Sequence, residues 1–118
     1  LQPVEWVENE TTGKKMLVYY SLGNFISHQT SLSQHCGGMA EIKIEKKNGE
    51  ISITSAKLVP VVCWYKSSGD KYEFSVYKLS DYTDSIADSH AQRSNGATPD
   101  YFREYASDIV SDEFLDMG

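Results

Sequence analysis

The 118-residue sequence predicts an α+β protein in which antiparallel β hairpins form a sheet, or part of a β-sandwich, followed by two C-terminal helices. Three observations lead to this prediction. Between residues 4 and 78, apolar and polar side chains alternate in short runs, which is typical of half-buried strands. Asn48-Gly49 stands between two such runs, and Asn-Gly is the strongest short-range hairpin signal. From Ser80 onward, apolar side chains recur every three or four residues, as on a helix.

The first predicted hairpin pairs residues 4–8 with residues 16–20 across a polar turn. Its second strand ends at a bend, residues 21–24, where Gly23-Asn24 are residue types that tolerate left-handed backbone. The Asn24 side chain can bond its own backbone at this bend or project toward a ligand. The following stretch, residues 27–38, has neither the strand nor the helix period, so we expect a long surface loop.

The second predicted hairpin is the clearest, because a two-residue turn at Asn48-Gly49 fixes its register. Ile44 then lies opposite Ile53, and Glu45 lies opposite Ser52 on the other face. Lys46 lies opposite Ile51, on the same face as Ile44. We expect the isoleucine face to be buried and the other face to be wet.

A third hairpin is predicted from residues 59–66 and 71–78, joined by a turn at residues 67–70. Pro60 can be accommodated only near the start of its strand or on an edge, because proline has no N–H to donate to a ladder. In the returning strand, the side chains of Tyr72, Phe74 and Val76 share one face.

Two helices complete the predicted fold. Ser80 is the expected cap of the first, whose apolar positions are Tyr82, Ile86 and His90, and Asn95-Gly96 ends it. Thr98-Pro99-Asp100 is a start signal for the second. The apolar stripe of that second helix consists of Phe102, Tyr105, Ala106, Ile109 and Val110.

Composition narrows the functional classes. The net charge of −6 makes a phosphate-tracking surface, and therefore nucleic acid, a poor expectation for a partner. No apolar run approaches the roughly 18 residues that a membrane helix needs, so the chain is predicted to be soluble as it stands. Cys36 and Cys63 fit no close zinc spacing, which leaves two free thiols or one isolated bridge open.

Few side chains suggest chemistry. His28, His35 and His90 are far apart in sequence and lack a recognisable metal-ligand spacing. The neighbours His35-Cys36 can hold a metal or activate a thiol, or both can be incidental in a polar loop. The tryptophans Trp6 and Trp64 can form a sugar-stacking platform or pack in the core. We therefore assign no catalytic residue and no metal ligand to this chain.

Four stretches in order carry a resemblance to a known family: residues 1–6, residues 17–27 with the motif Ser-Leu-Gly-Asn-Phe, residues 38–53 and residues 59–65. Together they resemble the C-terminal part of the CapA family of capsule synthesis, also called the PgsA type of poly-γ-glutamate synthesis, which is similar to calcineurin-like metallophosphatases. The resemblance implies a β-rich segment of a CapA-like domain over residues 1–79. It does not extend beyond Ser80, and the helical extension over residues 80–118 is predicted from the apolar period alone.

The resemblance also implies where chemistry lies. The family's expected metal ligands occur in earlier motifs, the last of them a Gly-His-x-His-like element immediately before the position of Leu1. Because this sequence starts without Met and already reads as a strand, we expect it to be a piece of a longer polypeptide. Divalent metals would then belong to the preceding part, with no cofactor held by this chain. Ser21, Gly23 and Asn24 would form a wall of the active cleft.

The resemblance further implies an extracytoplasmic or cell-surface bacterial parent, associated with a membrane through its other parts. Expected partners are the preceding part of the same polypeptide and the capsule-synthesis machinery or an anionic polymer. The isolated piece would form a dimer or swap strands to cover an exposed edge. An alternative remains open: an independent β-rich module that binds an anionic or carbohydrate polymer through residues 27–38 and exposed aromatic side chains.

Overall fold

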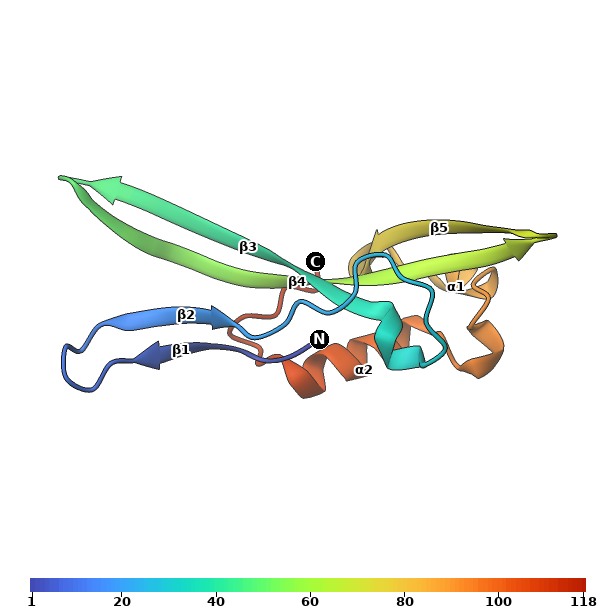
Figure 1. Cartoon of the computed structure of the whole chain (residues 1–118), viewed down its shortest axis with the longest axis horizontal. Coiled ribbons are helices and arrows are strands. Elements are labelled where there is room, and N and C mark those ends of the chain that lie inside the picture. The colour runs from blue at the N-terminus through green and yellow to red at the C-terminus, as the bar shows by residue number, and fades with distance from the viewer.

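A computed structural model describes all residues, 1–118, and shows an elongated α+β protein measuring 57 × 25 × 23 Å. Strands β1 (Val4–Glu8) and β2 (Lys15–Tyr19) form one antiparallel hairpin. Strands β3 (Cys36–Lys47), β4 (Glu50–Ser68) and β5 (Lys71–Lys78) form an antiparallel sheet in the order β3-β4-β5. The predicted fold class and all three hairpins are confirmed (Figure 1).

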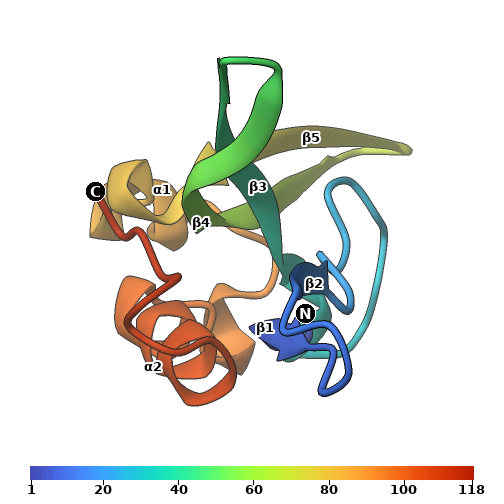
Figure 2. The same cartoon turned by 90° about the vertical axis from the view of Figure 1, so that its left-hand side faces the viewer.

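Helices follow the strands. Short 3-10 turns lie at Leu32–His35, Leu79–Asp81 and Arg93–Asn95, and the α-helices are α1 (Asp84–Asp88) and α2 (Pro99–Ile109). Seen along the long axis, α2 and the β1–β2 hairpin lie on the same side of the three-stranded sheet (Figure 2). The protein therefore has an upper layer of three strands and a lower layer that is part hairpin and part helix.

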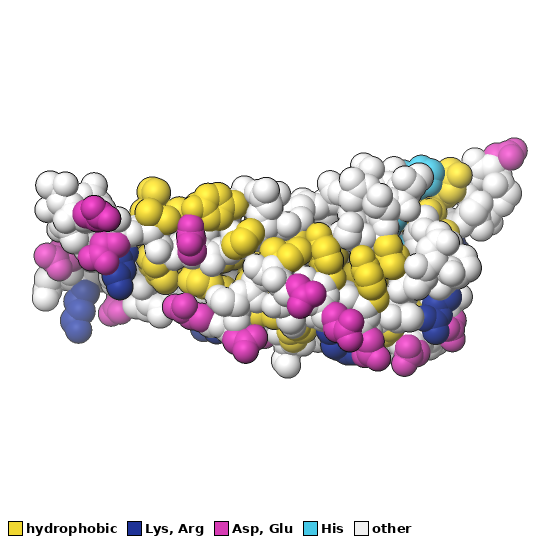
Figure 3. Space-filling model, turned by 90° about the horizontal axis from the view of Figure 1, so that it is seen from below, with side chains coloured by type: hydrophobic (Ala, Val, Ile, Leu, Met, Phe, Trp, Pro, Cys, Tyr) yellow, Lys and Arg dark blue, Asp and Glu magenta, His cyan; other side chains and the backbone are white.

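The core lies between these layers and consists of two clusters. The larger contains Val62 and Trp64 from β4 together with Tyr82 and Phe102 from the helical part, so residues on both sides of position 80 share one core. The smaller joins β1 to β4 and the C-terminal end, and its buried members are Val4, Leu58, Val110 and Phe114. A band of hydrophobic side chains is visible from below, with acidic side chains along one flank (Figure 3).

The expected burial of the second hairpin is wrong, although its register is confirmed. Ile44 pairs with Ile53, Glu45 with Ser52 and Lys46 with Ile51. However, Ile44 is 66% exposed and Ile51 is 71% exposed. This end of the hairpin projects past the core, and the β1–β2 hairpin that runs below it (Figure 1) does not bury its isoleucines, so the apolar face that the alternation predicts stays in solvent. We call the projecting part, residues 40–56, the arm.

A bulge at Thr54 keeps the apolar face of the arm continuous. Lys43 pairs with Ser55 and Ile44 pairs with Ile53, which leaves Thr54 without a partner. Because side chains alternate along a strand, Ile53 would otherwise point to the face opposite Leu58. The extra residue therefore brings the isoleucines of the arm onto the same face as the core residue Leu58.

Pro60 lies in the middle of a central strand, contrary to the expectation that it would be near a start or on an edge. The N–H of Leu58 donates to Phe114 O (2.7 Å) and its C=O accepts from Asp116 N (2.9 Å), so Leu58 turns both groups away from β3. Residues two apart turn the same way, so Pro60 turns its nitrogen to this side too. Because β5 begins to pair only at Val61, the missing N–H leaves no ladder bond unmade.

Two further expectations need correction. The first helix is capped by Thr83, whose Oγ1 accepts from Ile86 N at 3.4 Å, because Ser80 lies inside a 3-10 turn. The predicted loop over residues 27–38 is not entirely a surface loop: its last four residues, 35–38, are buried, since Cys36 already belongs to β3. The second helix is confirmed, with Thr98 accepting from Tyr101 N and Phe102 and Ala106 buried.

Candidate functional site

The predicted site residues come together in one place. Ser21, Gly23 and Asn24 lie in the segment that leaves β2 and crosses to the start of β3, and we call residues 21–24 the corner. Ser21 O accepts from Gln2 N at 2.9 Å, whereas Leu22 O accepts from Gly38 N at 2.7 Å. Through these bonds the corner connects the N-terminal segment to the three-stranded sheet.

Two glycines allow the backbones to meet here. Gly23 has φ of +70° and forms an antiparallel bridge with Gly37. A Cβ atom on Gly23 would lie 2.9 Å from Leu1 N and 3.0 Å from Cys36 O. A Cβ atom on Gly37 would overlap the carbonyl oxygen of Asn24. The Gly in the motif is therefore required both by its left-handed conformation and by close packing.

The polar side chains of the corner bond within the protein. The amide nitrogen of Asn24 donates to Gln34 O at 3.1 Å, and Ser21 Oγ accepts from Gly23 N at 3.2 Å. Asn24 thus does not bond its own backbone, as a simple turn predicts, but supports the chain ten residues later. Asn24 is half-buried, and these contacts do not test the prediction that it forms a cleft wall.

The deepest polar group is a pair of histidines that share one acceptor. His35 Nδ1 lies 3.1 Å from Cys63 O, and His90 Nε2 lies 3.2 Å from the same oxygen. Gln92 N donates to His90 Nδ1 at 2.9 Å, so Nδ1 carries a lone pair and Nε2–H donates to Cys63 O. Burial lowers the pKa of His90 to about 4, with nearby His35 also lowering it. His90 is therefore neutral at pH 7.

These histidine nitrogens are occupied by protein contacts. His35 Nε2 lies 3.0 Å from Gln29 O, so both of its ring nitrogens face carbonyl oxygens. Gln92 continues the network by donating from Nε2 to the Tyr65 hydroxyl at 2.7 Å. Sequence reasoning missed this network, because its members come from a loop, from β4 and from the segment after α1. No spacing in the sequence signals their proximity.

The thiols give no reactive centre. Cys36 and Cys63 are both free and buried. Burial raises the pKa of the Cys36 thiol to about 12, so its reactive thiolate form is scarce at pH 7. The suggestion that His35 activates Cys36 is therefore wrong. No group of three or more His, Cys, Asp or Glu side chains is arranged to hold a metal ion.

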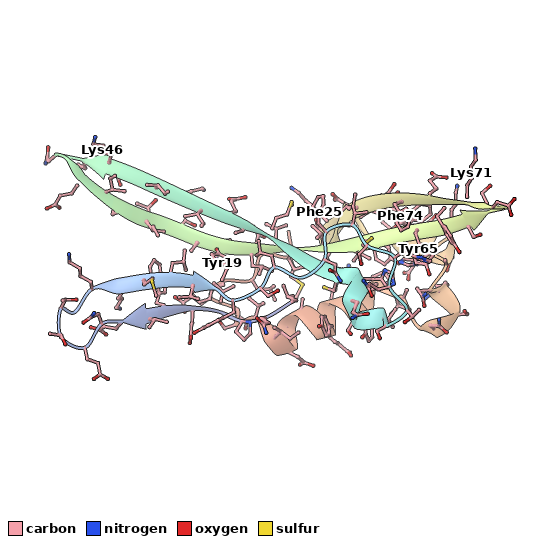
Figure 4. The ribbon with its side chains drawn as sticks, viewed as in Figure 1. Tyr19, Phe25, Lys46, Tyr65, Lys71 and Phe74 are labelled. Atoms are coloured by element: carbon pink, nitrogen blue, oxygen red, sulfur yellow. The ribbon has the colours of Figure 1, made fainter.

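Aromatic side chains gather at the other end of the sheet. Tyr65 stacks on Phe74 with ring centroids 5.6 Å apart, and His28 lies 4.6 Å from the exposed Tyr72. Figure 4 shows Tyr65 and Phe74 together below this end of β4 and β5. The predicted loop therefore does meet an aromatic surface. Of the two tryptophans, Trp64 is buried and donates from Nε1 to Ile86 O at 3.1 Å.

A groove lies where the arm leaves the core. It encloses roughly 230 Å³, and its lining includes Trp6 from β1, Ile53 and Ala56 from β4, and Phe114. The Tyr19 hydroxyl donates to Lys57 O at 2.8 Å and joins the two hairpins at the base of this groove (Figure 4). We call the arm together with the β1–β2 hairpin the fork, because beyond this base the two hairpins project in the same direction (Figure 1).

No helix in the structure combines the length and the apolar character needed to cross a membrane. Comparisons of the chain with protein families, with curated proteins and with solved structures found no match. The corner, the fork and the Ser-Leu-Gly-Asn-Phe motif are therefore the features of this chain that point to a function.

Proposed function

We propose that this chain is the noncatalytic C-terminal segment of a bacterial capsule or poly-γ-glutamate biosynthesis protein related to metal-dependent phosphoesterases. In this proposal it lies outside the cytoplasm or at the cell surface, and it binds the preceding part of its own polypeptide. The capsule-synthesis machinery or its anionic polymer would contact the assembled protein. The family part of the proposal comes from the Ser-Leu-Gly-Asn-Phe motif.

The open fork is the observation that supports a docking role. Half of the residues that line its groove are hydrophobic, namely Trp6, Ile53, Ala56 and Phe114, and the other half are polar or charged. A surface of this kind gains free energy when another apolar surface covers it. The corner lies beside Leu1, so residues preceding Leu1 in a longer polypeptide would begin next to Ser21, Gly23 and Asn24.

The donor set of this chain fits a supporting role. The corner offers an amide, a hydroxyl and backbone groups, and none of the acidic, imidazole or thiol side chains gathers into a metal-binding group. Divalent cations, where the whole protein uses them, would be held by its preceding part. We therefore assign Asn24 the role of holding the wall of a cleft and assign no chemical step to it.

The decisive test uses the whole polypeptide encoded by the gene. We expect a Gly-His-x-His-like element just before Leu1, and its absence would overturn the family assignment. Hydrogen exchange of residues 51–57 should be slower in the whole protein than in the 118-residue chain, since the preceding part covers the groove. Equal exchange rates would overturn the docking role.

An Asn24→Ala variant of the whole protein tests the cleft wall. The variant should keep its thermal unfolding midpoint within a few degrees, because it loses only one solvent-exposed hydrogen bond. Its ligand binding or activity should nevertheless fall. Unchanged activity would return Asn24 to a purely structural role. Asn95→Ala, which removes one amide hydrogen bond to Gln92 Oε1, is the matched control for an amide deletion.

A second candidate, a polymer-binding module, is favoured by the exposed Tyr72 with His28 packed on its ring. Aromatic faces stack on sugar rings, whereas the net charge of −6 opposes a polyanion. Binding of a neutral polysaccharide that is lost in Tyr72→Ala and kept in Tyr20→Ala, another exposed tyrosine, would favour this module over the docking segment.

A further inference from the structure

The outer edge of the arm is an unpaired strand. β3 is the edge strand of its sheet, and after Gly38 none of its backbone groups bonds to a segment other than β4. Gly38 N–H points away from β4 to Leu22 O. Because backbone groups alternate sides along a strand, the N–H and C=O groups of Ala40, Ile42, Ile44 and Lys46 also point outward.

The turn at the far end of β3 gives the same direction for its backbone groups as Gly38 does. Lys47 and Glu50 flank the two-residue turn and face each other across it, and in such a turn the flanking residues bond to each other. The backbone N–H and C=O groups of the odd-numbered residues of β3 therefore face β4, and Lys43 O indeed accepts from Thr54 Oγ1 at 3.3 Å. The even-numbered residues present a regular row of free donors and acceptors, which is a template for another strand.

The charges of β3 are self-complementary when the strand is reversed. Along one face the order is Glu41, Lys43, Glu45, Lys47. If two copies of β3 pair antiparallel about Ile44, Glu41 faces Lys47 of the second copy and Lys43 faces Glu45 of the second copy. A twofold axis repeats both contacts, so four opposite-charge pairs form.

Neighbouring registers lack this match. Centring the pairing on residue 43 places Lys43 opposite its own copy and Glu41 opposite Glu45. Centring on residue 45 places Glu45 opposite its own copy and Lys43 opposite Lys47. Like charges directly opposite each other destabilise a strand pair. Centring on residue 42 or 46 avoids this clash but keeps only one kind of opposite-charge pair within residues 41–47.

The backbone and the apolar face fit the same register. Ile44 has its N–H and C=O directed outward, so Ile44 and its copy would form a hydrogen-bonded pair, flanked by Ile42 opposite Lys46. The two arms would join into one four-stranded sheet whose isoleucines lie on a single face. Ile44, 66% exposed in one chain, would then have the Ile44 of the second copy beside it.

We propose that the occupant of this edge is a second copy of the chain, with β3 pairing antiparallel to β3 about a twofold axis at Ile44. The inference is independent of the proposed function, because it uses the outer edge of β3 and not the groove inside the fork.

The first test is the mass of the 118-residue chain in solution. Sedimentation equilibrium should show a monomer–dimer equilibrium, and a monomer at every concentration up to about millimolar would overturn the proposal. Ile44→Pro removes the central N–H donor, and proline is tolerated on an edge strand whose N–H faces solvent. This variant should be a monomer with an unchanged circular dichroism spectrum, whereas the control Ile44→Val should still dimerise.

The second test identifies the register through charge. Glu45→Lys places lysines opposite each other at two positions of the dimer, so the dissociation constant should rise about tenfold. Adding Lys43→Glu in the same chain restores opposite charges at both positions and should restore dimerisation. A dimer that Glu45→Lys strengthens, or that the double exchange fails to rescue, would overturn the proposed register.

Discussion

The two halves of β4 differ in what surrounds them. From Leu58 to Tyr65 the strand is almost entirely buried, with β3 and β5 beside it and α2 below. From Glu50 to Thr54 every residue is exposed, although the strand continues to pair with β3 as far as the turn and only the bulge at Thr54 shifts its register. A regular β ladder thus forms with or without a second layer, and the stability of the protein comes from the half where side chains pack.

The largest test of this difference deletes a side chain in each half. Phe102 is fully buried against β4 residues of the larger cluster, so Phe102→Ala should lower the free energy of unfolding by about 3–5 kcal/mol. Ile44→Ala in the arm should change it by less than about 0.5 kcal/mol. Urea denaturation of both variants gives the comparison, and equal losses would contradict it.

A substitution at the contact between corner and sheet should lower the stability of the protein, as a substitution in the packed half of β4 does. Gly37→Ala introduces a Cβ atom that overlaps Asn24 O, which is backbone and cannot move aside cheaply. We expect a loss of about 1–3 kcal/mol from overpacking, with faster amide exchange at Gly38, whose N–H donates to Leu22 O. The control Gly69→Ala has no atom within 4 Å and pays only for its positive φ, about 1 kcal/mol. A Gly37 variant no less stable than this control would show that the contact between corner and sheet is loose.

Because the buried histidine pair lies in the packed half, we expect the stability of that half, and not of the arm, to depend on pH. The pKa of His90 is about 4 in the folded chain against an ordinary 6.5, so the unfolded chain binds the extra proton first. Stability from this residue is complete above pH 6.5 and is lost as pH falls toward 4, by an amount on the order of 2–3 kcal/mol. Denaturation at several pH values in this range should show that the free energy of unfolding depends less steeply on pH in His90→Gln than in the unchanged chain. Identical slopes of this dependence would refute the assignment.

The smallest global effect is expected at the tip of the arm. Asn48 and Gly49 have φ of +51° and +80°, as a type I′ turn requires. Gly49→Val should strain this turn and accelerate amide exchange at residues 44–53. Because the tip does not pack against the core, the urea midpoint should fall less than in Gly37→Ala. A larger fall would mean that the arm and core unfold as one unit.

The sequence allowed a correct prediction where the information was local. Asn48-Gly49 determined the turn and the pairing of Ile44 with Ile53, and Thr98-Pro99 determined the start of α2. Burial was predicted wrongly in the arm, because alternation shows which side chains share a face and not what covers that face. The buried state of His35 likewise depends on distant carbonyls at Gln29 and Cys63.

The candidate site was predictable only in part. Gly23 and Asn24 were identified by residue type as a special bend, and the positive φ of Gly23 confirms the conformation expected there. The tight approach of Gly37 was not foreseeable, since Gly37 lies in what the sequence presents as a polar loop. The bulge at Thr54 was also not predicted, because an extra residue in one strand can be recognised only when its pairing with the neighbouring strand is known.

The unpaired residue Thr54 makes the arm tolerant of a particular genetic lesion. Loss of the single Thr54 codon would remove the bulge and leave composition, turn and strand length almost unchanged. Ile51 and Ile53 would still share a face with Ala56 and Leu58, because Ile53 would then directly precede Ser55. One in-frame deletion would thus straighten the ladder without exchanging the two surfaces of the outer arm, whereas a substitution at Thr54 would keep the extra residue.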